Sequence, residues 1–185
     1  MKSTFFTVWL LALLAAPVQA QNLGKQDADF LRRMGEADLA EVEAGKLAAQ
    51  KASSAEVKKY AQHMVDEHTK GMKEGEGLAK TKGQQPPASP DKKHQGAMKK
   101  LESMSGDAFD KAYMKQMVQD HQEVLKMLQS AAKSAQDPDI KAAAQKKIPI
   151  VQEHLSMAKT TVASLDGGKS GGKSSASGSS KKEAK

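Results

Sequence analysis

Residues 53–56 read Ser53-Ser54-Ala55-Glu56, between two long stretches in which apolar residues recur at helical spacing. A serine followed by a glutamate three residues later is typical of a capping box, the motif that begins a helix. The stretches on either side, 27–52 and 54–82, are therefore predicted to be helices joined by a very short turn. Because so short a turn sends the second helix back along the first, we predict an antiparallel hairpin.

A second hairpin is predicted over residues 107–134 and 138–165. Its second helix begins at Asp137-Pro138, an N-cap followed by proline at the first helical position. Between the hairpins, the prolines of residues 86–90 precede a segment, 90–104, that fits a short helix. The sequence leaves open whether this connection crosses the bundle or turns back. The predicted fold is all-α, a four-helix bundle made of two αα hairpins with a short connecting helix.

The two ends of the chain depart from the helical pattern. Residues 1–20 combine Lys2, an apolar stretch and small residues before Ala20, which predicts a signal peptide cleaved after Ala20 and a periplasmic or secreted protein. No later stretch approaches the roughly 20 apolar residues of a membrane span. Residues 167–185 carry five Lys and one Glu among Gly, Ser and Ala, so we expect a disordered tail. The helical bundle is expected within residues 21–166.

The net charge of +7 belongs mostly to this tail, which contributes +4, whereas the predicted bundle carries only about +2. We therefore expect no specific binding of nucleic acid, and at most weak contact of the basic tail with anionic surfaces. The chain has no cysteine, which excludes disulfides and thiolate metal sites. The oligomeric state does not follow from the sequence.

Histidines are the most informative polar residues of the predicted core. With a rotation of about 100° per residue, His68, His121 and His154 fall on or beside the apolar faces of three different helices. The first helix has no histidine but places Glu41 on its apolar face, with Asp38 next to it. His63 falls off the apolar face of its helix, so the zinc-protease spacing is not met.

Four of these residues are predicted to lie at one level of the bundle. Glu41 and His68 lie twelve and fifteen residues from the turn at Ser53, and His121 and His154 lie fifteen and eighteen residues from Gln136. The differences correspond to about 4.5 Å of helical rise, which long side chains can span. The sequence thus predicts a layer of one carboxylate and three imidazoles.

Such a layer provides ligands for a transition metal, and zinc, copper and iron all fit. Asp38, Met64 and Met117 are candidate auxiliary ligands, because each methionine lies four residues before a histidine and thioether sulfur favours Cu(I). The acidic residues that directly precede the histidines, Glu67, Asp120 and Glu153, are either hydrogen-bond acceptors for the imidazoles or exposed side chains.

Two hypotheses follow for the function. The first is a metal-binding bundle of the exported compartment. The second is a non-catalytic structural or stress-related interaction protein, whose core histidines are merely hydrogen-bonded. An enzyme is less favoured, because the chain lacks a Glu-x-x-His pair, a nucleophile elbow and a phosphate-binding loop.

Several stretches together resemble a known family. They are residues 40–48, 57–61, 64–68, 105–110 with Tyr113, Asp120-His121, Ile148-Pro149 and residues 153–155. On these residues the chain resembles the bacterial exported proteins described as domain of unknown function 4142, over roughly residues 27–165. The resemblance implies a ferritin-like helical bundle in the periplasm or at the cell surface, and recurrent positions at Glu41, His68, His121 and His154. It implies no reaction.

Overall fold

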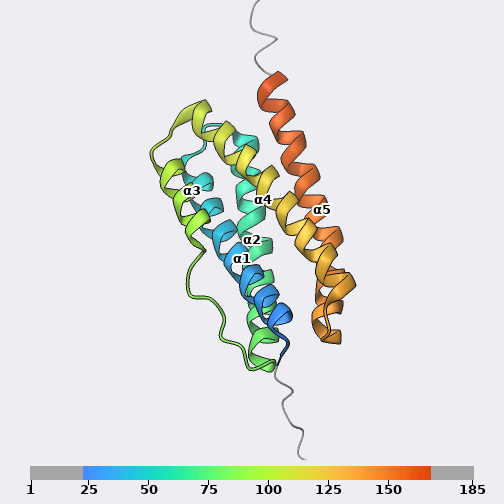
Figure 1. Ribbon diagram of the computed structural model, residues 1–185. Helices are drawn as coiled ribbons and strands as arrows, with labels where there is room; N and C mark the ends of the chain where they lie inside the picture. The colour runs from blue at the N-terminus through green and yellow to red at the C-terminus, as the bar shows by residue number, and fades with distance from the viewer. Residues whose placement is uncertain (1–22, 168–185) are drawn as a thin grey trace, which may run out of the picture.

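The computed structural model describes residues 23–167, and these form five α-helices and no strand. The helices are α1 (Lys25–Lys51), α2 (Ala55–Thr81), α3 (Lys92–Glu102), α4 (Gly106–Ser134) and α5 (Pro138–Gly167). α1 packs along α2 and α4 along α5, so the predicted pair of hairpins with a short connecting helix is confirmed (Figure 1). The predicted signal peptide, and the predicted tail beyond Gly167, lie outside the described residues.

The connection between the hairpins crosses the length of the bundle. α2 ends at the lower end of the molecule in Figure 1, whereas α4 begins at the upper end, and residues 82–91 and α3 cover the distance alongside α1. A Cβ atom on Gly35 would lie 2.7 Å from Cγ of Pro87, so a glycine in α1 allows this segment to pass close by. α2 and α4 therefore run in the same direction, an order compatible with the ferritin-like expectation.

Each hairpin turn is held by an aspartate from the other hairpin. The carboxylate of Asp110, in α4, accepts hydrogen bonds from the backbone N–H groups of Ser53 at 3.0 Å and Ser54 at 2.7 Å. The carboxylate of Asp27, in α1, accepts from the N–H groups of Gln136 at 3.0 Å and Asp137 at 2.8 Å. Because both carboxylates are buried, these bonds fix the ends of the two hairpins against each other.

The predicted capping box at Ser53 and Glu56 is wrong in its details. The N-cap of α2 is Ser54, whose hydroxyl accepts from the N–H of Val57 at 3.4 Å. In a capping box the glutamate accepts from the backbone N–H of the N-cap residue. Here Asp110 accepts from that N–H, of Ser54, and from the N–H of Ser53. The predicted N-cap of α5 is present, since Asp137 accepts from the N–H groups of Asp139 and Ile140.

The two hairpins repeat one pattern. Residues of α1 and the start of α2 match the residues 83 positions later in α4 and α5. The matched pairs are buried throughout and include Asp27 with Asp110, Phe30 with Tyr113, Met34 with Met117, Ala48 with Ala131, Ala52 with Ala135, Val57 with Ile140 and Ala61 with Ala144. The aspartates, the small residues near the turns and the first apolar residues after the turns therefore have equivalent structural roles in both hairpins.

The core consists of two apolar clusters. One contains Tyr60, Met64, Phe109, Tyr113 and Met117, near the turn between α1 and α2. The other contains apolar side chains towards the opposite end, including those of Phe30, Met34, Leu128, Ile140 and Val151. The buried polar residues Asp38, Glu41, His121 and His154 belong to neither cluster. Within residues 23–167, no helix has the length and apolar character needed to cross a bilayer.

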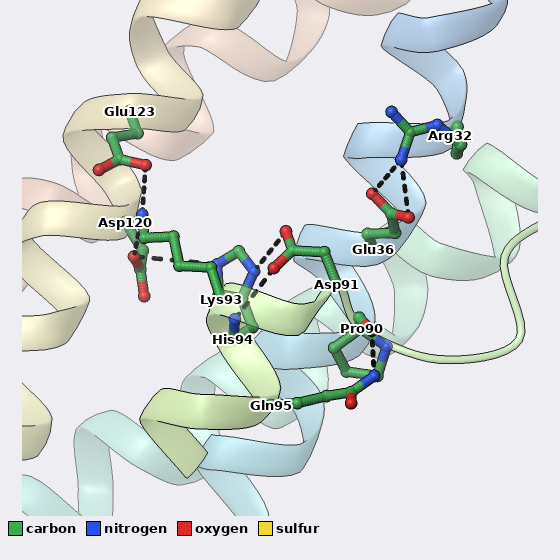
Figure 2. A network of polar contacts seen from close by, with 9 residues as sticks. All are labelled: Arg32, Glu36, Pro90, Asp91, Lys93, His94, Gln95, Asp120 and Glu123. Atoms are coloured by element: carbon green, nitrogen blue, oxygen red, sulfur yellow. Dashed lines mark hydrogen bonds and ion pairs between the residues drawn. The ribbon is translucent and has the colours of Figure 1, made fainter. Parts of the chain in front are cut away.

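α3 is attached to α4 through a polar network at its first turn (Figure 2). The carboxylate of Asp91 accepts from the backbone N–H of His94 at 3.0 Å and lies 2.9 Å from Nδ1 of the same residue. Lys93 reaches Glu123 on α4 at 2.5 Å, and its Nζ lies 3.7 Å from Asp120. His94 Nε2 lies 3.8 Å from Asp120. Asp120 therefore faces α3, away from the histidine that follows it in sequence.

Candidate metal centre

Three histidines meet between the two hairpins. His68 comes from α2, His121 from α4 and His154 from α5, and their ring centroids are 5.3–5.6 Å apart. One ring nitrogen of each lies within 4.8 Å of those of the other two. We refer to these three residues as the histidine cluster. Both hairpins contribute to it, so an ion bound there would link them.

Among residues 23–167, each histidine of the cluster has a buried nitrogen for which no hydrogen-bond partner is present. These atoms are Nε2 of His68, Nε2 of His121 and Nδ1 of His154. Burying a polar atom without a partner costs about 1–3 kcal/mol, so such atoms are rare in native proteins, and three in one group indicate a place where water or an ion binds. Their lone pairs are of the kind that transition metals bind.

The other nitrogens of two of these rings are held by the protein. Nδ1 of His68 lies 2.8 Å from Oδ1 of Asp38 on α1, and Nδ1 of His121 donates to the backbone carbonyl of Met117 at 2.8 Å. A proton on Nδ1 leaves the lone pair on Nε2. Both acceptors therefore favour the tautomer whose Nε2 is free to bind a metal ion. Asp38, a candidate auxiliary ligand in the sequence, is hydrogen-bonded to His68.

Lys147 of α5 in turn positions Asp38. Its Nζ lies 3.2 Å from Oδ2 of Asp38, while Oδ1 of the same carboxylate faces His68. A Cβ atom on Gly71 would lie 2.9 Å from this Nζ, so the glycine in α2 leaves room for the ammonium group. Asp38 and Lys147 thus add α1 to the helices that build the site.

Burial keeps two of the imidazoles neutral. Burial first, and the positive charge of His68 second, lower the pKa of His121 to about 4 and that of His154 to about 3. At neutral pH both rings therefore have free lone pairs. Burial also opposes protonation of His68, but the hydrogen bond to Asp38 and the charge of Glu41 outweigh it, so the pKa of His68 is raised.

Glu41 lies beside the cluster without joining it. Its Oε1 is 3.8 Å from Nδ1 of His121, the nitrogen that is already bonded to Met117, and its buried Oε2 has no partner. The pKa of Glu41 is raised to about 8, mainly by burial; the charge of His68 opposes this rise, and the charges of Asp120 and Asp38 support it. A protonated buried carboxyl of this kind would regain its charge next to a bound cation.

The remaining sequence candidates have other roles. The side chains of Met64 and Met117 are buried in the apolar cluster that contains Tyr60 and Tyr113, and Met117 supplies its carbonyl to His121. Among the acids that precede the histidines, Asp120 faces α3, Glu67 lines a cavity and Glu153 is exposed. The acceptor expected from them for His68 is Asp38, thirty residues away in sequence.

A cavity of about 80 Å³ leads to the cluster from the seam between α2 and α5. All three cluster histidines line it, together with Glu67, Lys147 and Ile150 among others. Since a water molecule needs only about 10–15 Å³ of such space, the cavity beside the three rings has room for a small ligand.

His63, which the helical geometry placed off the apolar face, also reaches the site. Its ring lies edge-on to His154 with centroids 5.4 Å apart, as close as the rings within the cluster. A sequence signal exists in hindsight, because His63 lies one turn before Glu67, on the side of α2 that faces α5. The helical wheel missed it, since α2 faces α1 and α5 in different directions.

The residues present fit a transition-metal ion. For bonds of about 2.0–2.1 Å, a tetrahedral ion separates its nitrogen ligands by about 3.3 Å, and the cluster nitrogens lie within 4.8 Å of one another. Small side-chain rotations would close that difference. Three imidazole ligands would leave a further coordination position. His68, whose pKa is raised, would release a proton on binding the ion.

The family model described as Domain of unknown function (DUF4142) matches residues 12–161. The chain belongs to this family. The matched region contains all of the histidine cluster, Asp38 and Glu41. No match is found among curated proteins.

Solved structures similar to this DUF4142 chain share its helical fold at low sequence identity. A DUF305 fragment from Deinococcus radiodurans has 12% identity and a TM-score of 0.68, covering 77% of this chain and 98% of its own. A putative secreted DUF305 protein from Streptomyces coelicolor has 16% identity and a TM-score of 0.64, covering 76% and 94%. CopM in its Cu(II)-bound form has 19% identity and a TM-score of 0.63, covering 75% and 96%.

Proposed function

We propose that this DUF4142 protein is an exported metal-binding bundle, which holds a transition-metal ion at His68, His121 and His154. Copper(II) is the preferred ion. The observation that carries the proposal is the convergence of three imidazoles: one nitrogen of each lies within 4.8 Å of those of the other two, and each ring has a buried nitrogen without a partner among the described residues. Export is supported by the signal-like residues 1–20 and by the similarity to a structure described as secreted.

Copper is preferred over zinc and iron for two reasons. One of the structurally similar proteins is described in a Cu(II)-bound form. Among the divalent ions of the first transition row, Cu²⁺ also binds a given set of nitrogen ligands most strongly. The absence of cysteine from the chain leaves imidazole nitrogen, carboxylate oxygen and thioether sulfur as the available ligand atoms.

The protein's own contribution is to prepare the ligands. Asp38 and the carbonyl of Met117 each hold an Nδ1 proton and so direct Nε2 of His68 and His121 towards the centre. Burial holds His121 and His154 neutral, because it lowers their pKa values. Glu41 offers a compensating negative charge once a cation is present. The bound ion would join both hairpins.

Metal content and thermal stability of the mature protein test this proposal. We expect one copper ion per chain after desalting, and a higher melting temperature with Cu²⁺ than without it. A ligand present at 100 times its Kd stabilises the folded state by about 2.7 kcal/mol. The His68→Ala, His121→Ala double variant should retain no copper after desalting and lose most of the rise in melting temperature. His94→Ala is the matched control, because it removes an imidazole outside the cluster.

The result that supports the alternative, an interaction protein with hydrogen-bonded core histidines, is equally specific. In that case the protein is metal-free after purification, and its melting temperature is unchanged by Cu²⁺ and Zn²⁺. The double variant would then lose stability without any change in metal binding. A larger shift with Zn²⁺ than with Cu²⁺ would keep the site but reassign its metal.

A further inference from the structure

His63 extends the row of imidazoles from the cluster towards solvent. It is partly exposed, whereas His121 and His154 are each only 2% exposed. Its ring meets His154 edge-on, with an interplanar angle of 82° and centroids 5.4 Å apart. His154 is thus the one ring that contacts His63, His68 and His121.

His63 lies outside both the cluster and its cavity. The three-histidine group whose nitrogens lie within 4.8 Å of one another does not include it. The cavity is lined on α2 by residues from Glu67 to Glu74, so His63 lies one turn beyond its edge. Within residues 23–167, His63 makes no hydrogen bond or ion pair, and its contact with α5 is the ring contact with His154.

We propose that His63 and His154 form a second, outer metal position, through which the ion passes between solvent and the histidine cluster. The inference rests on the proposed function and adds a route to it. A neutral imidazole binds one ion at a time through its single free lone pair. Because His154 is shared, the outer and inner positions cannot both be filled, so the outer one serves in transit.

This arrangement has a kinetic consequence. An ion first held by His63 and His154 is already tethered to a ring whose centroid lies 5.3 Å from that of His68 and 5.5 Å from that of His121. The next ligand exchange is therefore an intramolecular step. The same route serves release, because the forward and reverse exchanges pass through the same position. His63 should therefore change the rates of loading and release in proportion and leave the equilibrium affinity nearly unchanged.

Tyrosine fluorescence offers a direct readout of loading. The only tyrosines are Tyr60 and Tyr113, and the only tryptophan, Trp9, lies in the predicted signal peptide. Both tyrosines are buried, and the charge of Glu41 contributes to a raised pKa of each, so both lie near the site. Cu²⁺ bound at the cluster should quench them, and stopped-flow mixing of the mature protein with Cu²⁺ follows the quenching in time.

The decisive comparison is wild type against His63→Ala, with His94→Ala as control. We expect His63→Ala to load Cu²⁺ about tenfold more slowly and to release it to EDTA about tenfold more slowly, since the tethered step is lost. Its affinity in a competition titration should match that of wild type. His94→Ala should load and release at the wild-type rates.

Each other outcome overturns a definite part of the account. Wild-type rates in His63→Ala overturn the outer position and leave the proposed function standing. A lower affinity with an unchanged loading rate makes His63 a ligand of the cluster itself and also overturns the transit role. Wild-type protein that binds no Cu²⁺ overturns both proposals.

An equilibrium experiment checks the same pair independently. The His68→Ala, His121→Ala double variant keeps His63 and His154, so it should still bind Cu²⁺ weakly and lose it on desalting. Adding His63→Ala should abolish this weak binding. Equal weak binding in the double and triple variants would place the residual ion elsewhere and contradict the outer position.

Discussion

The two hairpins are alike at their ends and different in their middles. Near the turns the matched positions carry the same kinds of residue, such as Asp27 with Asp110 and Ala52 with Ala135. In the middle the match breaks down, because Asp38 corresponds to His121 and Gly71 to His154. His68 and Glu41 correspond to Val151 and Val124. At these middle positions a polar residue of one hairpin therefore matches an apolar residue, a glycine or a different polar residue of the other.

This difference separates the residues that build the fold from those that build the site. The repeated positions fill the two apolar clusters and hold the turns. The positions that differ lie in the polar layer. There Asp38 of the first hairpin orients His68 of the same hairpin, and the second hairpin supplies His121 and His154. The unpartnered nitrogens therefore belong to positions at which the two hairpins carry different residues.

The largest expected effect comes from breaking a repeated position. Asp110→Ala leaves the N–H groups of Ser53 and Ser54 without their acceptor, and Asp27→Ala does the same to Gln136 and Asp137. Hydrogen bonds to a charged group contribute about 1.5–3 kcal/mol each, so each variant should lose about 3 kcal/mol or more in urea unfolding. If the ends are equivalent, the two losses should be similar.

These variants also check the separation of fold and site. At temperatures where they remain folded, both should bind Cu²⁺ with wild-type affinity, since neither aspartate contacts the cluster. A large loss of affinity in either variant would mean that the turns also determine the site geometry.

A position where the repeat differs should give the opposite result. Asp38→Asn keeps the size of the side chain but removes the charge that holds the Nδ1 proton of His68. Asparagine still offers an acceptor oxygen, but loss of the charged partner of a metal-binding histidine should lower metal affinity by about 10–100-fold, which a competition titration measures. Lys147→Met should produce a smaller loss, because Lys147 acts only through Asp38.

The pH dependence of the metal-free protein tests the middle layer without any ion. The pKa of Glu41 is raised by burial from 4.5 to about 8, so the folded state binds this proton more tightly than the unfolded state. Its contribution is fully present below about pH 4.5 and is lost as the pH rises towards about 8. Glu41→Gln should therefore become more stable relative to wild type across this range, by about 1 kcal/mol or more.

The histidines give the opposite trend at lower pH. Their lowered pKa values, about 4 for His121 and about 3 for His154, mean that the unfolded state binds their protons first. Stability should fall as the pH drops from about 6.5 towards those values. A His121→Gln, His154→Gln variant should lose less stability over this interval. Parallel curves for variant and wild type would show that neither imidazole is buried as described.

The smallest effect concerns Gly71, the counterpart of His154. A Cβ atom on Gly71 meets Nζ of Lys147, whereas a Cβ atom on Gly75 meets nothing within 4 Å. Gly75→Ala should stabilise α2 by about 0.5–1 kcal/mol, the usual gain from replacing glycine within a helix. Gly71→Ala should gain less, because Lys147 must move away from Asp38. Equal gains in thermal melts would show that the contact has no energetic weight.

Much of the fold followed from local sequence signals. Helical periodicity and the short turn at Ser53-Ser54 predicted the hairpins, and counting from the turns placed His68, His121 and His154 at one level. That part succeeded because helix rise and rotation per residue are fixed. The ligand role of these histidines, and of Glu41, remains a prediction.

The rest depended on contacts between helices distant in sequence. The crossing connection, the bonds from Asp110 to the opposite turn and the link between Asp38 and His68 are tertiary, and a helical wheel does not contain them. His63 was not predicted for the same reason. α2 packs against both α1 and α5, whereas a helical wheel identifies a single apolar face. The repeat with an offset of 83 residues was present in the sequence, and comparing the chain with itself would have revealed its equivalent turns.

The central claim is that the three unpartnered nitrogens bind one ion, and pulsed EPR after loading with one equivalent of Cu²⁺ and desalting tests it most directly. Wild type and His94→Ala should retain one copper ion whose spectrum shows coupling to imidazole nitrogens. The His68→Ala, His121→Ala variant should retain none. An identical spectrum at full copper content in that variant would contradict the account.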